Sequence, residues 1–301
     1  MLVIAMADLP APPRSNSRLR LVSPMLFDQV HAATRKQHAE LNACIISCLP
    51  LALPPKASDP ALLGHGLAAF AQIFNAFESA WDELEADATN REEDEHESQV
   101  RTWLASLRPS GLPRSQRLEQ DLNYIEARIG HTIDKGSAKL DFLYDIKHLV
   151  PVKSHVLVAY AWVFYMAVFS GGRWIRGQLA QAGPEFWIGP SEKARDDVLA
   201  TSPGFSFLSF DGDKDGEDIK ALFKARLVGA ETLLTPDERQ DIIDSACKIF
   251  DDCITLVKYL DQKDPELHSQ APGLPLTLKI VVAMATLAFL WSWVVLFNHI
   301  I

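Results

Sequence analysis

The residues of this chain that could do chemistry begin with two histidines and an arginine near its N-terminus. His31, Arg35 and His38 follow one another at intervals of four and three residues. Because a helix has about 3.6 residues per turn, this spacing places all three on one helical face. A neutral imidazole can ligate a heme iron, and a neighbouring guanidinium can pair with a ligand carboxylate. The alternative is a charged surface whose histidines have ordinary structural partners.

A second candidate site lies in residues 160–176, which are apolar for ten residues and then carry Ser170, Gly171 and Gly172. A helix that is apolar all round belongs in the interior of a protein. Adjacent glycines predict a sharp bend. Since glycine has no Cβ, the backbone at such a bend can lie against a flat ligand. The alternative is a buried helix that bends for packing alone.

Two clusters of charge follow later in the chain. Lys220 and Lys224 lie one helical turn apart, with Arg226 close by, and predict a basic face. Residues 211–216 (DGDKDG) resemble the first half of an EF-hand loop. However, Leu222 occupies the loop's last position, where calcium binding requires a bidentate Glu. We therefore interpret residues 211–216 as an acidic turn.

The sequence lacks the short motifs of several large enzyme classes. It contains no G-x-S-x-G, P-loop, G-x-G-x-x-G or HExxH pattern. Hydrolase, kinase and nucleotide-binding functions therefore have no support.

The elements that must position these residues are predicted to be helices throughout. Apolar residues recur with helical spacing, and no stretch alternates as a strand would over a convincing length. The acidic residues 87–97 are interpreted as a solvated run, and residues 184–210 are expected to form turns. The soluble part is therefore predicted to be all-α. The expected helices cover residues 25–46, 58–85, 114–129, a long stretch after Pro151, 218–232 and 237–260.

Charge and hydropathy indicate where the protein acts. The net charge of −10 argues against non-specific nucleic-acid binding, which needs basic patches. The four cysteines have no metal-binding spacing, and we interpret them as reduced thiols facing the cytosol. Residues 280–297 are uncharged and apolar, and Lys279 precedes them. This run is long enough to cross a hydrocarbon layer of about 30 Å, and its flanking charge predicts a tail-anchored protein with a cytosolic domain.

Prolines set the predicted boundaries of the helical domain. Four fall within residues 1–24, which we expect to form a disordered leader. Three fall within residues 263–278, which we expect to link the domain to its anchor. The helical domain is therefore predicted over residues 25–262 and the transmembrane anchor over residues 279–299.

Taken in order, these motifs resemble the heme oxygenase family, most closely its fungal, membrane-anchored branch. Residues 34–38 (TRKQH) look like the first-helix motif whose His is the proximal iron ligand. Residues 169–172 (FSGG) resemble the distal-helix signature, and residues 220–226 (KALFKAR) the helix whose basic residues hold the propionates. Residues 234–240 and Phe250 match the helix after it. The similarity spans roughly residues 27–260 and implies a heme oxygenase-like bundle of helices with a C-terminal transmembrane helix.

Four positions depart from the family pattern. Val168 stands where the family commonly has an Asp that organises water on the distal side, and Ala167 replaces a Gly. His31 replaces a Lys, and Trp162 replaces a Tyr that often contacts a propionate. A valine cannot hold water by hydrogen bonding, so the first departure concerns the supply of protons. The fungal branch is similar in having an apolar residue at this position.

The resemblance implies both an activity and a set of roles. The activity is cleavage of heme, at once substrate and cofactor, by O2 to biliverdin, CO and ferrous iron. Electrons from NADPH would come through a partner resembling cytochrome P450 reductase, at the endoplasmic reticulum or another internal membrane. The alternatives are a protein of this fold that stores or senses heme, and a di-iron oxygenase, whose Glu-x-x-His pairs we do not find. The implied roles are iron ligation by His38, heme binding by His31, Arg35, Trp162, Lys220, Lys224 and Phe250, and a distal side formed by Ala167, Val168, Ser170, Gly171 and Gly172.

Overall fold

The computed structural model describes residues 25–87, 94–134, 141–188 and 204–262. Within these ranges the regular elements are helices and none is a strand, which confirms the predicted all-α class. The predicted leader (residues 1–24), linker and C-terminal anchor lie outside the described residues. For them the expectations from the sequence stay predictions.

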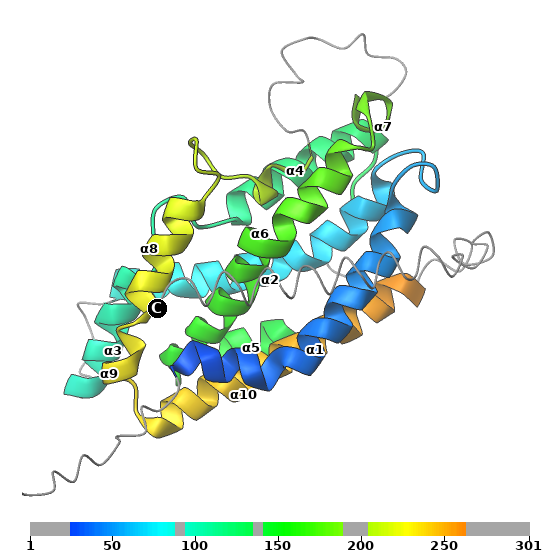
Figure 1. Cartoon of the computed structure of the whole chain (residues 1–301). Coiled ribbons are helices and arrows are strands. Elements are labelled where there is room, and N and C mark those ends of the chain that lie inside the picture. Colours follow the sequence, from blue (N-terminus) through cyan, green and yellow to red (C-terminus); the bar gives the residue numbers. More distant parts are fainter. Residues whose placement is uncertain (1–24, 88–93, 135–140, 189–203, 263–301) are drawn as a thin grey trace, which may run out of the picture.

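The helices follow one another as separate rods (Figure 1). Three short 3-10 helices lie between them. The elements are α1 (Leu26–Cys48), η1 (Leu49–Ala52), α2 (Ala61–Asp87), α3 (Glu95–Leu107), α4 (Ser115–Ile129), α5 (Asp141–Leu149), η2 (Ser154–Val156), α6 (Leu157–Ala180), α7 (Pro184–Ile188), η3 (Ser206–Leu208), α8 (Glu217–Leu227), α9 (Ala230–Leu233) and α10 (Pro236–Gln262).

α3, α5 and the short α7 were not expected from the sequence. α3 begins inside the acidic run that we interpreted as solvated. The side chain of Asp94 accepts a hydrogen bond from the Glu97 N–H (2.8 Å) and so caps this helix. Acidic side chains in a first turn also suit the positive end of a helix dipole. The same residues therefore start a helix. Residues 184–210, expected as turns, contain the short helices α7 and η3 in their described parts.

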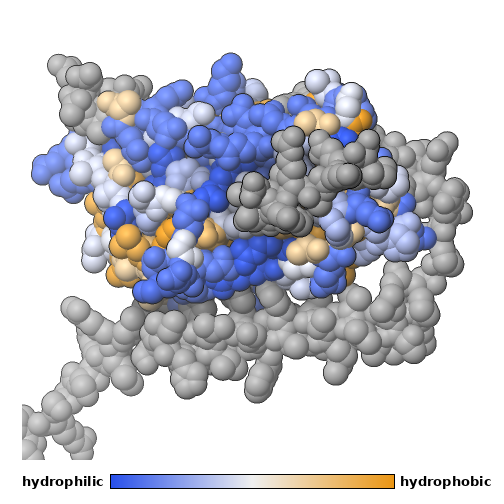
Figure 2. All heavy atoms as spheres, turned by 90° about the horizontal axis from the view of Figure 1, so that it is seen from above, coloured by the Kyte–Doolittle hydropathy of each residue, from blue (hydrophilic) through white to orange (hydrophobic). Residues whose placement is uncertain are grey.

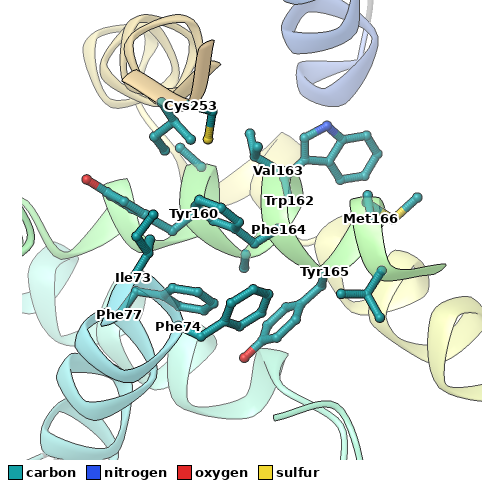
Figure 3. Close-up of a cluster of buried hydrophobic side chains, with 14 of the residues drawn as sticks. Ile73, Phe74, Phe77, Tyr160, Trp162, Val163, Phe164, Tyr165, Met166 and Cys253 are labelled. Atoms are coloured by element: carbon teal, nitrogen blue, oxygen red, sulfur yellow. The ribbon is translucent and has the colours of Figure 1, made fainter. Parts of the chain in front are cut away.

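α6 is the central element of the core. Residues 154–180 are long and apolar enough to span a membrane, but 83% of the most apolar part is buried inside the protein. Figure 3 shows Phe74 and Phe77 of α2 packed against Phe164 and Tyr165 of α6. The ring centroids of Phe77 and Phe164 lie 5.8 Å apart and nearly parallel. α6 is therefore the core helix that its all-round apolar surface predicted.

A buried carboxylate joins three helices around this core. Glu78 of α2 is only 4% exposed and accepts a hydrogen bond from the Tyr165 hydroxyl of α6 (2.9 Å). It also accepts the backbone N–H groups of Arg114 (2.8 Å) and Ser115 (2.9 Å) at the start of α4. These N–H groups have no partner within their own helix, so Glu78 caps α4 from another element. The carboxylate thereby holds α2, α4 and α6 in one arrangement.

α1 lies along α10, and its first turn also reaches α6 (Figure 1). Lys258 of α10 donates to Glu40 of α1 (2.7 Å). At the other end of α1, the rings of Phe27 and Trp162 have centroids 4.4 Å apart. Seen from above, the described surface is largely hydrophilic, with apolar side chains gathered toward one end (Figure 2). The contact between Phe27 and Trp162 sets the start of α1 beside α6, as a site between the two helices requires.

Candidate functional site

The predicted face of α1 is exposed to solvent. His31, Arg35 and His38 are all exposed and share one side of the helix. His38 follows Phe27 by about three helical turns, so both residues lie on the same side. Since Phe27 packs against Trp162 of α6, His38 is on the side of α1 that adjoins α6.

The surroundings of His38 suit an imidazole that binds a metal. Its ring meets the edge of Phe250 of α10, with centroids 5.8 Å apart. Burial by surrounding atoms lowers the pKa of His38, and the nearby His31 lowers it further. The residue is nevertheless exposed to solvent, so the side chain is crowded by protein atoms but remains accessible. At neutral pH the imidazole is therefore uncharged and accessible, which is the form that ligates iron.

α6 carries a strip of small residues that begins within its buried first half. From Leu157 to Phe169 every residue except Ala167 is buried. Gly171 follows one turn later on the same side, and among the described residues nothing lies within 4 Å of where its Cβ would be. We call Ala167 and Gly171 the α6 strip. Because its side chains are a methyl group and a hydrogen atom, a flat ligand can approach the backbone here.

Gly172 has a different environment from its neighbour. It is buried, and a Cβ there would lie 3.1 Å from Leu208 Cδ2 of η3 and 3.7 Å from Val168 Cγ1. Gly172 therefore lets η3 approach α6 closely. Ser170 is half-buried, and α6 continues through both glycines without a break.

Val168 belongs to the buried side of α6. It is 5% exposed and lies on the side that Leu208 covers. The structure therefore places the methyl groups of Val168 against η3 and leaves Ala167 on the open strip.

His38 and the α6 strip lie at similar heights along their helices. α1 and α6 start close together, at Phe27 and Trp162, and run in the same general direction (Figure 1). With a rise of about 1.5 Å per residue, His38 is about 17 Å beyond Phe27, and Gly171 is about 14 Å beyond Trp162. The two predicted halves of the site therefore lie at similar heights on two helices that touch near their starts.

Trp162 itself is 7% exposed and packs on Phe27, on the side of α6 that faces α1 (Figure 3). The two aromatic side chains pack between α1 and α6 close to the starts of these helices. Trp162 thus contributes apolar surface at a position where the family resemblance implied a propionate contact.

Of the two lysines of α8, Lys224 lies near Asp28 in the first turn of α1, and Lys220 lies one turn earlier on the same helix. Lys220 is half-buried, with its Nζ 3.7 Å from Glu217 Oε2. Burial lowers the pKa of Lys224, and the charge of Lys220 lowers it further, while Asp28 of α1 opposes the shift. The two lysines therefore form one electropositive group on α8, which can meet ligand carboxylates.

Two carboxylates of the acidic turn, those of Asp211 and Asp215, form ion pairs with arginines. Arg117 of α4 donates to Asp211 (2.6 Å), and Arg176 of α6 binds both oxygens of Asp215 (2.8 and 2.5 Å). These ion pairs agree with the interpretation of residues 211–216 as an acidic turn and leave two acids of the calcium-like pattern neutralised.

The residues present fit an iron porphyrin. An accessible neutral imidazole stands on α1, backbone with small side chains lies on α6, and two lysines stand one helical turn apart on α8. A flat ligand with two carboxylates matches this set of groups.

The family follows from a comparison with known sequences. The model of the heme oxygenase family matches residues 26–258, most of the chain. The chain belongs to the heme oxygenase family. No curated protein matches it in sequence, and membership of the fungal branch stays a prediction.

Solved heme oxygenases share the fold at low sequence identity. Heme oxygenase 2 from Chlamydomonas reinhardtii, solved without heme, is 20% identical, with a TM-score of 0.57 over 78% of this chain and 97% of its own. Heme oxygenase-1 from the cyanobacterium Synechocystis, in complex with heme, is 16% identical, with a TM-score of 0.56 over 87% and 99%. Heme oxygenase-2 from Synechocystis, with heme and NO, is 15% identical, with a TM-score of 0.57 over 83% and 94%. The predicted heme oxygenase fold is thereby confirmed.

Several residues that shape the site of this heme oxygenase family member were not found from the sequence. Phe27 and Glu78 act through contacts with α6, and Asp215 and Glu217 through ion pairs with its arginines. The one available signal was the pair Arg173 and Arg176 directly after the glycines, which adds positive charge to an apolar helix.

Proposed function

We propose that this protein is a heme oxygenase that cleaves heme to biliverdin, CO and ferrous iron. O2 is the oxidant, and electrons come from NADPH through a partner resembling cytochrome P450 reductase. The observation that carries the proposal is the combination, within a member of this family, of an accessible neutral His38 and the α6 strip. Neither feature is required by a protein that only packs its own core.

The chain's own residues would divide the work as follows. His38 would hold the iron from the α1 side, and the edge of Phe250 would fix the orientation of its ring. Gly171 and Ala167 would let the opposite face of the ligand lie close to the α6 backbone. Lys220 and Lys224, with Arg35 and His31 on α1, would hold the propionates. When bound, heme supplies the iron at which O2 is activated and is itself the molecule cleaved.

The direct test is turnover by the full chain. Heme, O2, NADPH and a P450-type reductase are added, and biliverdin is followed by its absorption and CO by its capture on a reporter hemoprotein. We expect both products, and we expect neither from His38→Ala. Binding of heme without either product would disprove the enzymatic proposal.

A second candidate is a protein that binds heme without cleaving it, for storage or sensing. The observation that favours it is Val168, which is buried and apolar at the position of the family's distal Asp, with the Ala167 methyl on the open strip. Val168→Asp discriminates the two, with Val168→Asn as the control for shape and folding. Turnover that appears only with Val168→Asp indicates a protein that has lost the reaction. Turnover by the unchanged chain rules this candidate out.

The membrane location belongs to the same proposal. An apolar segment at residues 280–297 would anchor the protein in the endoplasmic reticulum or another internal membrane, with the helical domain in the cytosol. The net charge of −10 suits docking to a basic face of a reductase and would act mainly on the association rate. A variant that ends at Gln262 should move from the membrane to the soluble fraction of cells. Its presence in the membrane fraction would contradict the anchor.

A further inference from the structure

Two arginines that directly follow the glycine pair tie α6 to the start of α8. Arg176 binds the Asp215 carboxylate through two parallel hydrogen bonds of 2.8 and 2.5 Å. Arg173 donates to the backbone oxygen of Asp215 (2.8 Å), and its Nη1 lies 2.5 Å from Glu217 Oε1. We call these four residues the α6–α8 clamp. A two-pronged arginine–carboxylate pair fixes orientation as well as distance.

The backbone of the clamp adopts an uncommon conformation. Among the described residues, Asp215 alone combines a side chain with a positive φ, at 47°. That left-handed conformation costs roughly 1 kcal/mol for a residue with a Cβ, although Asp tolerates it better than most. Gly216 follows with φ 79°, and a Cβ there would come within 2.5 Å of the Phe210 ring. The chain is thus bent sharply at the point where the Asp215 carboxylate meets α6, as is common at functional positions.

The clamp also connects two parts of the heme site. Glu217 is the first residue of α8, and its second carboxylate oxygen lies 3.7 Å from Lys220 Nζ. Lys224 follows one turn later on the same face. On the other side of the clamp, Arg173 comes two residues after Gly171 of the α6 strip. One set of ion pairs therefore joins the surface on which the ligand would lie to the lysines that would hold its carboxylates.

We propose that Asp215 is a positioning residue for heme. Through Arg173 and Arg176 it sets the distance between the α6 strip and the α8 lysines, so that Lys220 and Lys224 meet the propionates of a heme lying on the strip. This inference rests on the proposed heme site. The side chains of the clamp are partly exposed, and exposed ion pairs add little to overall stability. The loss of Asp215 should therefore affect placement of the ligand more than folding.

The test combines two variants of the full chain with two ligands. Asp215→Asn keeps the shape and the tolerance for positive φ but removes the charge. Asp211→Asn is the matched control, because Asp211 lies in the same turn and pairs with Arg117 of α4, not with α6. Each protein is titrated with heme and with its dimethyl ester, which has the same iron and ring but no free carboxylates. Absorption of the iron complex reports binding.

We expect Asp215→Asn to weaken heme binding by about three- to fivefold, the equivalent of one partly exposed ion pair. It should leave binding of the ester unchanged, and Asp211→Asn should change neither. Arg176→Gln should also weaken heme binding, and the double variant should be no worse than Asp215→Asn alone, because that substitution already removes the ion pair with Arg176.

Three results would overturn the proposal, and they differ from one another. Equal weakening for heme and ester would mean that Asp215 acts on the fold in general. Unchanged heme binding in both Asp215→Asn and Arg176→Gln would mean that the clamp does not position the lysines. Failure of the unmodified chain to bind heme at all would refute the proposed function and this inference with it.

Discussion

The His38 side chain is crowded by protein atoms and yet accessible to solvent. This combination distinguishes a candidate metal ligand from an ordinary surface histidine. The crowding that lowers the pKa of the ring keeps it uncharged at neutral pH, while its exposure to solvent admits a ligand. His65 of α2 is exposed as well, but it lies on another helix and outside the candidate site. The two histidines therefore form a natural pair for comparison.

Replacing the iron ligand should abolish the normal heme complex. We expect His38→Ala to weaken heme binding by about tenfold or more and to shift the absorption maximum of the complex, because the iron loses its axial nitrogen. Added imidazole should restore part of the spectrum. His65→Ala should behave like the unmodified chain, and the same loss in both variants would contradict the assignment of His38.

At the scale of single helices, the two glycines of α6 differ because their environments differ. Among the described residues nothing lies within 4 Å of a Cβ at Gly171, whereas a Cβ at Gly172 would lie 3.1 Å from Leu208 Cδ2, which leaves little room for a methyl group. A glycine pair in a sequence reads as one motif, but here one residue serves access to the backbone and the other serves the contact between α6 and η3.

This difference predicts opposite effects on stability and binding at Gly171. Gly171→Ala should raise the melting temperature or leave it unchanged, since Ala favours a helix by roughly 1 kcal/mol over Gly. It should also weaken heme binding, since the methyl group occupies the α6 strip. Gly177→Ala is the control on the same helix, with nothing within 4 Å among the described residues. Gly177→Ala should change stability as Gly171→Ala does but leave heme binding unchanged. An equal loss of heme binding in Gly177→Ala would contradict the role of the α6 strip in binding.

The carboxylate of Glu78 should be a major determinant of stability, because it serves α2, α4 and α6 at once. Gln offers one oxygen and an N–H2 group in its place, so buried donors of α4 lose their acceptor. We expect Glu78→Gln to lower the free energy of unfolding by about 2–4 kcal/mol. Urea unfolding measures this change. Glu83→Gln, at an exposed position of the same helix, should stay within about 0.5 kcal/mol.

For the molecule as a whole, acid should weaken the fold through its paired carboxylates. The hydrogen bond from Arg176 lowers the pKa of Asp215 below its ordinary value of 3.8. Burial acts to raise the pKa of Asp241, but hydrogen bonds from Lys153 and His155 outweigh it and leave this pKa lowered too. Such groups bind protons more readily when unfolded, so their contribution is complete above the unfolded value and is lost as the pH falls through the folded value.

We therefore expect the free energy of unfolding to fall steeply below about pH 4, as measured by urea unfolding across a pH series. Asp241→Asn should flatten part of this slope, because one proton-linked group is removed. Asp121, whose pKa burial raises, works in the opposite direction and should reduce the slope slightly. A free energy of unfolding that stays constant from pH 6 to pH 3 would show that these ion pairs do not contribute to stability, and it would contradict the prediction.

Local spacing in the sequence was enough to predict most helices, the shared face of His31 and His38, and the burial of α6. These features depend on residues within a few turns of one another, and periodicity records them directly. α3 was missed because an acidic run looks the same whether it is solvated or begins a helix. The short α5 gave too few turns for a periodic pattern.

Only the tertiary structure decided which atoms meet across the core. It showed that Gly172 meets Leu208 while no other described side chain crowds Gly171, that Val168 is buried on the side toward η3, and that Asp215 is held by the arginines of α6. Each of these facts depends on segments far apart in the chain, whose contact is set by how whole helices pack. Spacing along one helix carries no information about the partner that will cover it, so the residue types of the site could be predicted from the sequence but not their neighbours.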